Sequence, residues 1–367
     1  MFNPPSFSNL QQRIAKSTAD DVKRALVAPH PNTDDLAALL APAAEDYLQE
    51  MASRSAEITA RRFGRTTQIY APLYLSNICT NRCVYCGFSS ENKIDRRLLS
   101  IDEAEQEALI LHGRGFQHIL LVSGEAPKVL GVDYLEAVAN RLRDRFASIT
   151  IEVQPLTTEE YSRLFSAGIT GVAIYQETYD RQVYDQVHLA GKKRDFDFRL
   201  ATPARVAAAN MREVGIGVLL GLADWRTEGL TLGLHLAWLR RNYWRTALTV
   251  SFPRLRPAAG GFTPLVHTGE KALSQLIFAL RIFDEDVGIV LSTREDPRYR
   301  DGMVGLGPTR YSAGSCTAPG GYAHPAQEGE QFAVGDHRTI NEVCAVIREK
   351  GFDPVRKDWD AGFQLHG

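Results

Sequence analysis

SNICTNRCVYCGFSSENKI, residues 76–94, contains three of the five cysteines in the chain. Cys79, Cys83 and Cys86 are spaced as CxxxCxxC, and an apolar, strand-like stretch from Ile69 to Leu75 leads into them. Thiolate is a soft ligand that suits iron–sulfur clusters and zinc. Such clusters normally take four cysteines, and no fourth cysteine lies nearby. The spacing therefore predicts a metal centre with one open position, which is free to bind a small molecule.

A zinc site is the alternative interpretation of the same loop. Structural zinc prefers four protein ligands, usually arranged as CxxC pairs. The loop has a single CxxC, and neither a second pair nor a suitable histidine cluster follows it, so the ligand count disfavours zinc. A disulfide framework is also disfavoured, because five cysteines in 367 residues are sparse and odd in number.

Composition excludes several other classes of protein. The net charge of −2 at pH 7 gives no electrostatic reason to expect a nucleic-acid or anionic-membrane partner. No apolar run reaches the ~18 residues that a membrane span needs, and residues 1–16 lack the apolar core of a signal peptide. We therefore expect a reducing cytoplasm, which also suits an oxygen-sensitive cluster.

From about Thr66 the pattern alternates between strand, turn and helix. Ser100 and Thr157 begin capping boxes, and Thr202 is expected to cap a helix with a proline at its first position. The expected strands are Gln68–Leu75, His118–Val122, Thr150–Gln154, Gly171–Tyr175, Ile216–Leu220, Leu248–Phe252, Gly288–Leu291 and Thr309–Ser312. Eight strands that alternate with helices predict an α/β fold of the (βα)8 TIM-barrel type. A doubly wound sheet is the competitor, but no GxGxxG follows the first strand.

The chain is expected to divide into three parts. Residues 1–63 form a helical arm, residues 64–330 the barrel, and residues 331–367 a C-terminal extension that packs on the barrel and includes Trp359. A barrel gathers its functional residues at the C-terminal ends of its strands. Beyond the cysteine loop, polar residues follow the predicted strands at these positions: Ser123, Gln154, Glu177, Asp224, Arg254, Arg294 and Ser315.

The spacing CxxxCxxC resembles the signature of the radical S-adenosylmethionine (SAM) enzymes. Tyr85 supplies the aromatic residue expected just before the third cysteine, and it would lie by the adenine. The resemblance implies a 4Fe–4S cluster held by Cys79, Cys83 and Cys86, whose open iron binds SAM. It also implies that an electron from the cluster cleaves SAM and gives a 5′-deoxyadenosyl radical.

Other residues suit the SAM ligand. Ser123-Gly124-Glu125 resembles the glycine-glycine-glutamate motif that receives the SAM ammonium group in this superfamily, with serine in place of the first glycine. Glu177 stands where the superfamily often has a ribose-binding residue. Arg199 is a candidate for the SAM carboxylate, because guanidinium–carboxylate contacts are bidentate and strong. The alternative for Arg199 is a solvated helix residue.

Longer motifs are spread over most of the chain: AEDYLQEMA, RRFGRTTQIYAPLYLSNICTNRCVYCGF, ILLVSGEAPK, VAIYQETYD, GKKRDFDFRL, LSTRED, SAGSCTAPGGY and VRKDWD. Together they closely resemble the 2-iminoacetate synthases, the tyrosine lyases of thiamine biosynthesis. The resemblance implies that the adenosyl radical takes a hydrogen from the amino group of L-tyrosine, and that the Cα–Cβ bond then breaks. The expected products are 2-iminoacetate (dehydroglycine), p-cresol, 5′-deoxyadenosine and methionine. A thiazole synthase is the implied partner, and flavodoxin or ferredoxin is the implied electron donor.

Charged residues after the later strands are the candidates for substrate contacts. Arg294, in STRED, is the first choice for the tyrosine carboxylate, with Arg254 or Arg256 in reserve, and Ser315 is expected to hydrogen-bond the same carboxylate. The candidates for an acceptor of the phenol proton are acidic residues after strands five and seven: Asp224, Glu295 and Asp296.

One related family is disfavoured by its cysteines, and two alternatives stay open at this point. The hydrogenase-maturation tyrosine lyases carry further cysteines for a second cluster, whereas here only Cys316 and Cys344 lie beyond the loop and they form no CxxC. The tryptophan lyase of indolic acid synthesis shares the barrel and the motifs. A non-catalytic zinc- or iron-binding protein would use the cysteine loop alone.

Overall fold

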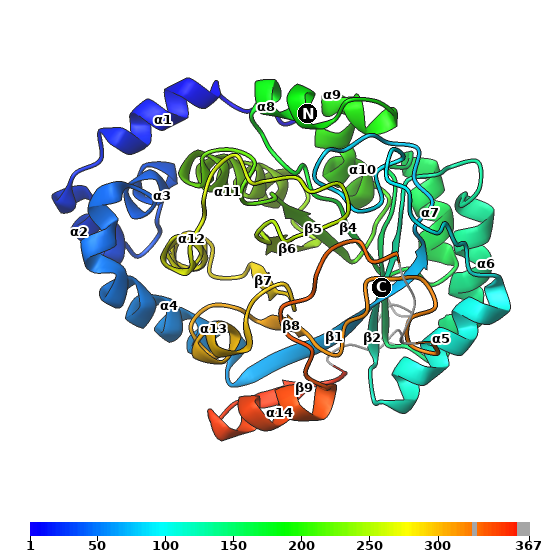
Figure 1. Cartoon of the computed structure of the whole chain (residues 1–367). Helices are drawn as coiled ribbons and strands as arrows, with labels where there is room; N and C mark the ends of the chain where they lie inside the picture. Colours follow the sequence, from blue (N-terminus) through cyan, green and yellow to red (C-terminus); the bar gives the residue numbers. More distant parts are fainter. Residues whose placement is uncertain (325–328, 358–367) are drawn as a thin grey trace.

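The computed structural model describes residues 1–324 and 329–357, and its centre is a closed barrel of parallel strands ringed by helices (Figure 1). The strands follow chain order around the barrel, and β1 closes it by pairing with both β2 and β8. The barrel strands are β1 Thr66–Ser76, β2 His118–Ser123, β3 Ser148–Glu152, β4 Gly171–Ala173, β5 Glu213–Gly217, β6 Ala247–Ser251, β7 Gly288–Leu291 and β8 Arg310–Ser312. The predicted (βα)8 barrel and all eight of its strands are confirmed.

Several strand boundaries differ from the predicted ones, and two of them bear on the site. β5 begins at Glu213, three residues before the predicted Ile216. Glu213 was not predicted to lie in a strand. Its carboxylate accepts two hydrogen bonds from Arg310 on β8, at 2.6 and 2.8 Å, inside the barrel. β4 ends at Ala173 instead of Tyr175, although the amides of Ile174 and Gln176 still donate to carbonyls of β5, and the chain then reaches Glu177, whose φ of 72° lies in the left-handed region.

Helices surround the barrel and connect its strands. They are α5 Ile101–Gly113, α6 Val132–Leu142, α7 Thr158–Ser166, α8 Arg181–Val187, η2 Lys192–Arg194, α9 Phe196–Leu200, α10 Thr202–Ala208, α11 Trp225–Asn242, α12 Glu270–Phe283 and α13 Pro297–Gly302. The capping boxes expected at Ser100 and Thr157 both form. Thr202 is the first residue of α10 and not its cap, because the preceding helix runs almost directly into α10.

The N-terminal segment wraps around the outside of α11 and α12 (Figure 1). Its elements are α1 Phe7–Ala15, α2 Ala19–Val27, α3 Thr33–Leu39, the 3₁₀ helix η1 Pro42–Tyr47 and α4 Leu48–Phe63. Leu36 is fully buried against α11, where a Cβ on Gly233 would lie 2.2 Å from its Cδ2. A glycine is therefore required at position 233 for this close helix packing.

The C-terminal segment returns over the barrel mouth and then packs beside β1. Amide groups of Gly335 and Asp336 donate to the carbonyl of Thr293, at 2.8 and 3.0 Å. α14 Ile340–Glu349 follows, and the short strand β9 Asp353–Val355 pairs in parallel with the first residues of β1. β9 was not predicted, and Trp359 lies outside the described residues. The division at residues 63/64 and 330/331 stays a prediction.

Within residues 1–324 and 329–357, no helix combines the length and apolar character needed to cross a bilayer.

Candidate functional site

The cysteine loop leaves β1 at the C-terminal end of the barrel and is fastened mainly by side chains that bond to backbone carbonyls. The guanidinium of Arg96 donates to four of these carbonyls, those of Asn77, Phe88, Ser89 and Asn92. The Asn92 amide donates to the carbonyls of Cys86 and Gly87, at 3.1 and 3.0 Å. These bonds satisfy carbonyl groups that regular secondary structure does not reach, and so they fix the shape of the loop.

Cys79, Cys83 and Cys86 are free thiols on this loop. Cys86 packs both with the cluster around Cys83 and Tyr85 and with the one that Cys79 joins. Burial raises the pKa of the Cys83 and Cys86 thiols and so disfavours the thiolate form. A bound metal centre favours thiolate and therefore opposes this effect. No three His, Cys, Asp or Glu side chains in the described part of the chain gather closely enough for a single ion. An iron–sulfur cluster differs from a single ion because its thiolate ligands bind separate iron atoms. The three cysteines on this loop fit such a cluster.

The Ser123-Gly124-Glu125 turn follows β2 and lies against the cysteine loop. A Cβ on Gly124 would lie 2.4 Å from the carbonyl oxygen of Ile78 and 3.0 Å from the Cβ of Cys79. The amide and hydroxyl of Thr80 both donate to the carbonyl of Glu125, at 3.0 and 2.9 Å. Only glycine allows the two backbones to approach so closely, so the motif holds the Glu125 side chain at a fixed place beside the cysteines.

Four charged residues form a buried chain of ion pairs beyond this turn. Arg199 donates to Glu125 at 2.8 Å and lies 3.8 Å from Glu177, which accepts at 2.6 Å from Lys193. The four side chains are only 6–12% exposed, which excludes a solvated helix position for Arg199. Burial alone would raise the pKa of Glu177, but Lys193 and Arg199 outweigh it and lower that pKa. Glu177 therefore stays ionised, so its carboxylate can face polar groups of a ligand.

Tyr85 lies in an apolar pocket beside Cys83 and close to this chain of charges. Its hydroxyl is 2.8 Å from Nε2 of His188, whose Nδ1 is 2.9 Å from the carbonyl of Tyr184. Burial lowers the pKa of His188 to about 2, so the ring is neutral. Because Nδ1 must donate to the carbonyl, Nε2 accepts from Tyr85, which fixes the phenol ring in place.

A cavity opens into the barrel mouth, and the residues that line it include Tyr74, Glu152, Arg294 and Ser315. The Arg294 guanidinium stacks on the ring of Phe332 at 3.4 Å and makes no ion pair with any residue in the described ranges. The hydroxyl oxygen of Ser315 is buried and also has no hydrogen-bond partner there. Arg294 and Ser315, two of the predicted substrate residues, therefore line one cavity. Their side-chain polar groups make no hydrogen bond or ion pair with the described residues.

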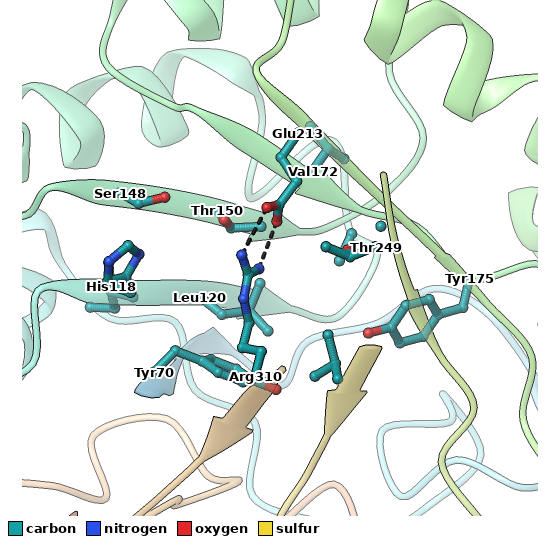
Figure 2. A pocket seen from close by; sticks show the side chains of 14 residues that line it. Tyr70, His118, Leu120, Ser148, Thr150, Val172, Tyr175, Glu213, Thr249 and Arg310 are labelled. Carbon is teal, nitrogen blue, oxygen red and sulfur yellow. Dashed lines mark hydrogen bonds and ion pairs between the residues drawn. The ribbon is translucent and has the colours of Figure 1, made fainter. Parts of the chain in front are cut away.

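A second polar space of about 480 Å³ lies deeper in the barrel, and Tyr70 and Tyr175 border both spaces. Figure 2 shows the paired Arg310 and Glu213 crossing it, with Ser148 and Thr150 on one wall. This ion pair fills the barrel interior beneath the upper cavity.

The structure does not bring the predicted phenol-proton acceptors to the upper cavity, which corrects their expected position. Asp224 caps α11 by accepting from the amide of Thr227 at 3.0 Å. Asp296 caps α13 in the same way. Glu295 is 1% exposed and forms an ion pair with Arg254, so one of the two reserve arginines is also engaged. Each of these groups is held by a local or tertiary partner and does not line the cavity.

Sequence reasoning missed Glu152, which is the only acidic residue that lines the upper cavity in the described part of the chain. A usable signal was present in β3, where Ser148, Thr150 and Glu152 alternate with Ile149 and Ile151. Successive residues of a strand point to opposite faces, and so three polar residues at this spacing face the barrel interior. Lys193 was also missed, although it lies within the GKKRDFDFRL motif.

Comparisons with known proteins agree with this geometry. The family model of the radical SAM superfamily matches residues 73–230, and that of the biotin and thiamin synthesis associated domain matches residues 251–353. The 2-iminoacetate synthases of Salmonella typhimurium and Escherichia coli are 45% and 44% identical to the chain, over 97% of its length and 94% of theirs. A crystal structure of HydG, a maturase of the FeFe-hydrogenase, has a TM-score of 0.90 at 31% identity, covering 98% of this chain and 81% of that one. The chain therefore belongs to the 2-iminoacetate synthase family of the radical SAM superfamily, whose enzymes use a 4Fe–4S cluster and SAM.

Proposed function

We propose that the chain is a radical lyase that breaks the Cα–Cβ bond of L-tyrosine. The products are 2-iminoacetate and p-cresol, with 5′-deoxyadenosine and methionine, and the imine serves thiazole formation in thiamine biosynthesis. The observation that carries the proposal is the cavity beside the cysteine loop, where Arg294 and Ser315 have no partner among the described residues. The 45% identity to a 2-iminoacetate synthase over 97% of the chain supports the same reaction.

The cofactor half of the site is built by the chain's first two βα units. Cys79, Cys83 and Cys86 would hold the 4Fe–4S cluster, because three free thiols on one loop match its three protein ligands. When bound, the cluster and SAM together supply the 5′-deoxyadenosyl radical. The turn at Gly124 and Glu125 would receive the SAM ammonium group.

The far side of the SAM site comes from later units of the barrel. Glu177 suits a ribose diol because it is ionised and held by a left-handed backbone, with a φ of 72°. Strain of this kind collects at functional sites. Tyr85 offers a fixed aromatic face for adenine. Arg199 is engaged with Glu125 and with the carbonyl of Tyr175 at 2.6 Å, and so we propose that it positions the acids. A direct bond from Arg199 to the SAM carboxylate stays a prediction.

The substrate half of the site is an anion receptor in the upper cavity. A half-buried guanidinium without a counter-ion is unfavourable, and desolvation indeed lowers the pKa of Arg294. The carboxylate of an amino acid would supply the missing charge through two parallel hydrogen bonds. The unpartnered hydroxyl of Ser315 would supply a third bond. We propose that these two residues fix the carboxylate and thereby the orientation of Cα.

The C-terminal segment helps to exclude water from this cavity. Gln331 and Phe332 line it, and the Tyr74 hydroxyl donates to the Gln331 side chain at 2.7 Å. The Gln331 side chain also reaches Sγ of Cys86, at 3.9 Å. This segment therefore joins the cysteine loop to the substrate cavity, which suits a reaction whose radical must be kept from solvent.

Product analysis tests the proposed reaction. The anaerobically reconstituted protein is incubated with SAM and dithionite, together with either tyrosine or tryptophan, and p-cresol and 5′-deoxyadenosine are measured. We expect p-cresol with tyrosine and no substrate-dependent deoxyadenosine with tryptophan. Abundant deoxyadenosine with tryptophan but none with tyrosine would show that the chain is a tryptophan lyase instead. A colourless preparation with stoichiometric zinc would instead favour the non-catalytic alternative.

Two variants connect this outcome to the residues. Cys83→Ala should abolish SAM cleavage while the barrel stays folded, because the thiol is not part of the main core cluster. Arg294→Lys keeps the charge but loses the planar fork, so the KM for tyrosine should rise about tenfold or more. Equal turnover by either variant and the parental enzyme would contradict the assigned role.

Partners and compartment are proposed from the chemistry of the product. An imine hydrolyses in water, so a thiazole synthase that receives it directly is the expected protein partner. Flavodoxin or ferredoxin would deliver the electron, and a reducing cytoplasm suits the cluster.

A further inference from the structure

The upper cavity contains two opposite charges that do not neutralise each other. Arg294 lies after β7, and Glu152 is the last residue of β3. Both line the same cavity, yet neither forms an ion pair with the other or with any residue in the described ranges. In the cofactor region, by contrast, Lys193 and Arg199 are paired with Glu177 and Glu125. A cavity with one free cation and one free carboxylate is complementary to a zwitterion.

Strand geometry directs the Glu152 side chain into this space. Ser148 and Thr150, on the same strand, point into the barrel interior (Figure 2). Side chains alternate along a strand, so Glu152 continues this inward row one step nearer to the barrel mouth. It therefore lies above the Arg310–Glu213 pair and on the level of the substrate cavity.

We propose that Glu152 binds the ammonium group of the amino-acid substrate and takes one proton from it, which leaves a neutral amine for hydrogen-atom removal. This inference rests on the proposed function, since it assigns the base of the same reaction. When Arg294 binds the substrate carboxylate, the amino nitrogen lies only two bonds from the carboxylate carbon. Glu152 is the only acidic residue among the described ones that line the cavity, and so it is the one available to that nitrogen.

The proton transfer balances without any other reactant. The N–H bond of R–NH3⁺ breaks, its electron pair stays on nitrogen, and the proton bonds to the Glu152 carboxylate. The products are R–NH2 and a neutral carboxylic acid, and no atom is oxidised or reduced. Removal of a hydrogen atom from the ammonium form would place a positive charge and a radical on one nitrogen, whereas the amine gives an uncharged radical.

The surroundings suit a group that changes its charge near neutral pH. The titratable and charged groups that influence Glu152 come from several elements: Tyr70, Tyr74, Tyr175, Glu177, Lys193, Arg199 and Arg294. Burial and the nearby Glu177 outweigh the three cations and raise the pKa of Glu152 to about 7. A base works best when its pKa lies near the working pH. An arriving ammonium group would favour the carboxylate and lower that pKa again.

Binding measurements separate this role from a structural one. The reconstituted holoenzyme and its Glu152→Gln variant are titrated anaerobically with tyrosine and with 3-(4-hydroxyphenyl)propionate, which lacks only the amino group. We expect the variant to bind tyrosine about tenfold more weakly and the amine-free acid with unchanged affinity. Equal losses for both ligands, or no loss for either, would overturn the ammonium contact. Glu159→Gln, an exposed carboxylate at the start of α7, is the matched control and should change neither affinity.

Kinetics test the proton transfer itself. The p-cresol rate of Glu152→Gln should fall about 100-fold, within the usual range for loss of an acid–base group, and Glu152→Asp should recover part of it. For the parental enzyme, kcat/KM should rise with pH up to about 7 and then level off, whereas the glutamine variant should lose that rise. Parental rates and the parental pH profile in Glu152→Gln would overturn the proposal. Absence of p-cresol from the parental enzyme would instead refute the proposed function, while the two titrations would still decide the ammonium contact.

Discussion

Asp336→Asn should be among the most damaging single changes outside the cysteine loop. The side chains of Asp336 and Arg300 are 0% and 1% exposed, and they form an ion pair. Asp336 also accepts from Arg338 at 2.7 Å, and Arg338 in turn pairs with Asp301 at 2.8 Å. The asparagine removes the charge and leaves Arg300 buried without a counter-ion. The substitution therefore tests whether this ion pair fastens the C-terminal segment to the barrel.

The magnitude follows from burial. Removing one partner of a buried pair costs about 3–5 kcal/mol, whereas a surface pair contributes about 0–1 kcal/mol. Asp301→Asn is the matched control, because its side chain is 30% exposed and serves the same arginine cluster. We expect the free energy of unfolding to fall by about 3–5 kcal/mol for Asp336→Asn and by less than about 1 kcal/mol for Asp301→Asn.

Urea unfolding of the two variants, followed by circular dichroism, measures this difference. With a slope of about 3 kcal/mol per molar urea, the midpoint of Asp336→Asn should fall by about 1–1.7 M. The amides of Gly335 and Asp336 also bond to the carbonyl of Thr293, next to Arg294, so the KM for tyrosine should rise as well. Arg338 and Arg300 outweigh the effect of burial and lower the pKa of Asp336. The stabilisation is therefore present above the ordinary aspartate pKa and is lost as the pH falls below it. Equal midpoint shifts for the two variants at pH 7 would refute the reasoning.

Three further changes probe the cofactor side. Gly124→Ala should weaken SAM binding about 10–100-fold, because forced overpacking costs about 1–3 kcal/mol; Gly113→Ala, with open space around it, is the calorimetric control. His188 stays neutral because its pKa is lowered to about 2, so the unfolded chain alone gains a proton below pH 6.5. Stability should therefore fall by about 2 kcal/mol between pH 7 and pH 5, and the fall should be shallower in His188→Gln. Gln331→Leu removes a donor to Cys86 and should make the cluster potential more negative in a redox titration.

The barrel could be predicted because its strands are marked by local patterns. Apolar runs and helix caps revealed all eight strands, and Gly288–Leu291 even has the predicted bounds. Errors arose where a partner far away in the chain decides the structure. Glu213 belongs to β5 because Arg310 meets its charge inside the barrel. β9 forms because the first residues of β1 extend beyond β2, whose pairing begins at Ala71, and so present backbone groups to residues 353–355.

The residues of the proposed cofactor site could be placed in the fold for the same reason. Cys79, Cys83 and Cys86 stand on one loop, and the Gly124 turn directly follows one strand, so short sequence windows contain them. The acid candidates were misplaced because a carboxylate just after a strand has two common uses. It can serve a barrel mouth, or it can cap the next helix, as Asp224 and Asp296 do. The residue sequence at such a position does not distinguish these uses.

Pairing, rather than residue type, separates the functional charges from the structural ones at the barrel mouth. Arg254 and Glu295 satisfy each other, so they contribute no free charge to the cavity. Arg294 and Glu152 come from distant parts of the chain and line the same cavity. Within the described ranges neither has an ionic partner. A fold would lose such unpaired charges if stability alone decided the sequence, because each burial costs free energy. Their presence in one cavity therefore suits a ligand that completes both charges at once, and a free amino acid is the simplest molecule that does so.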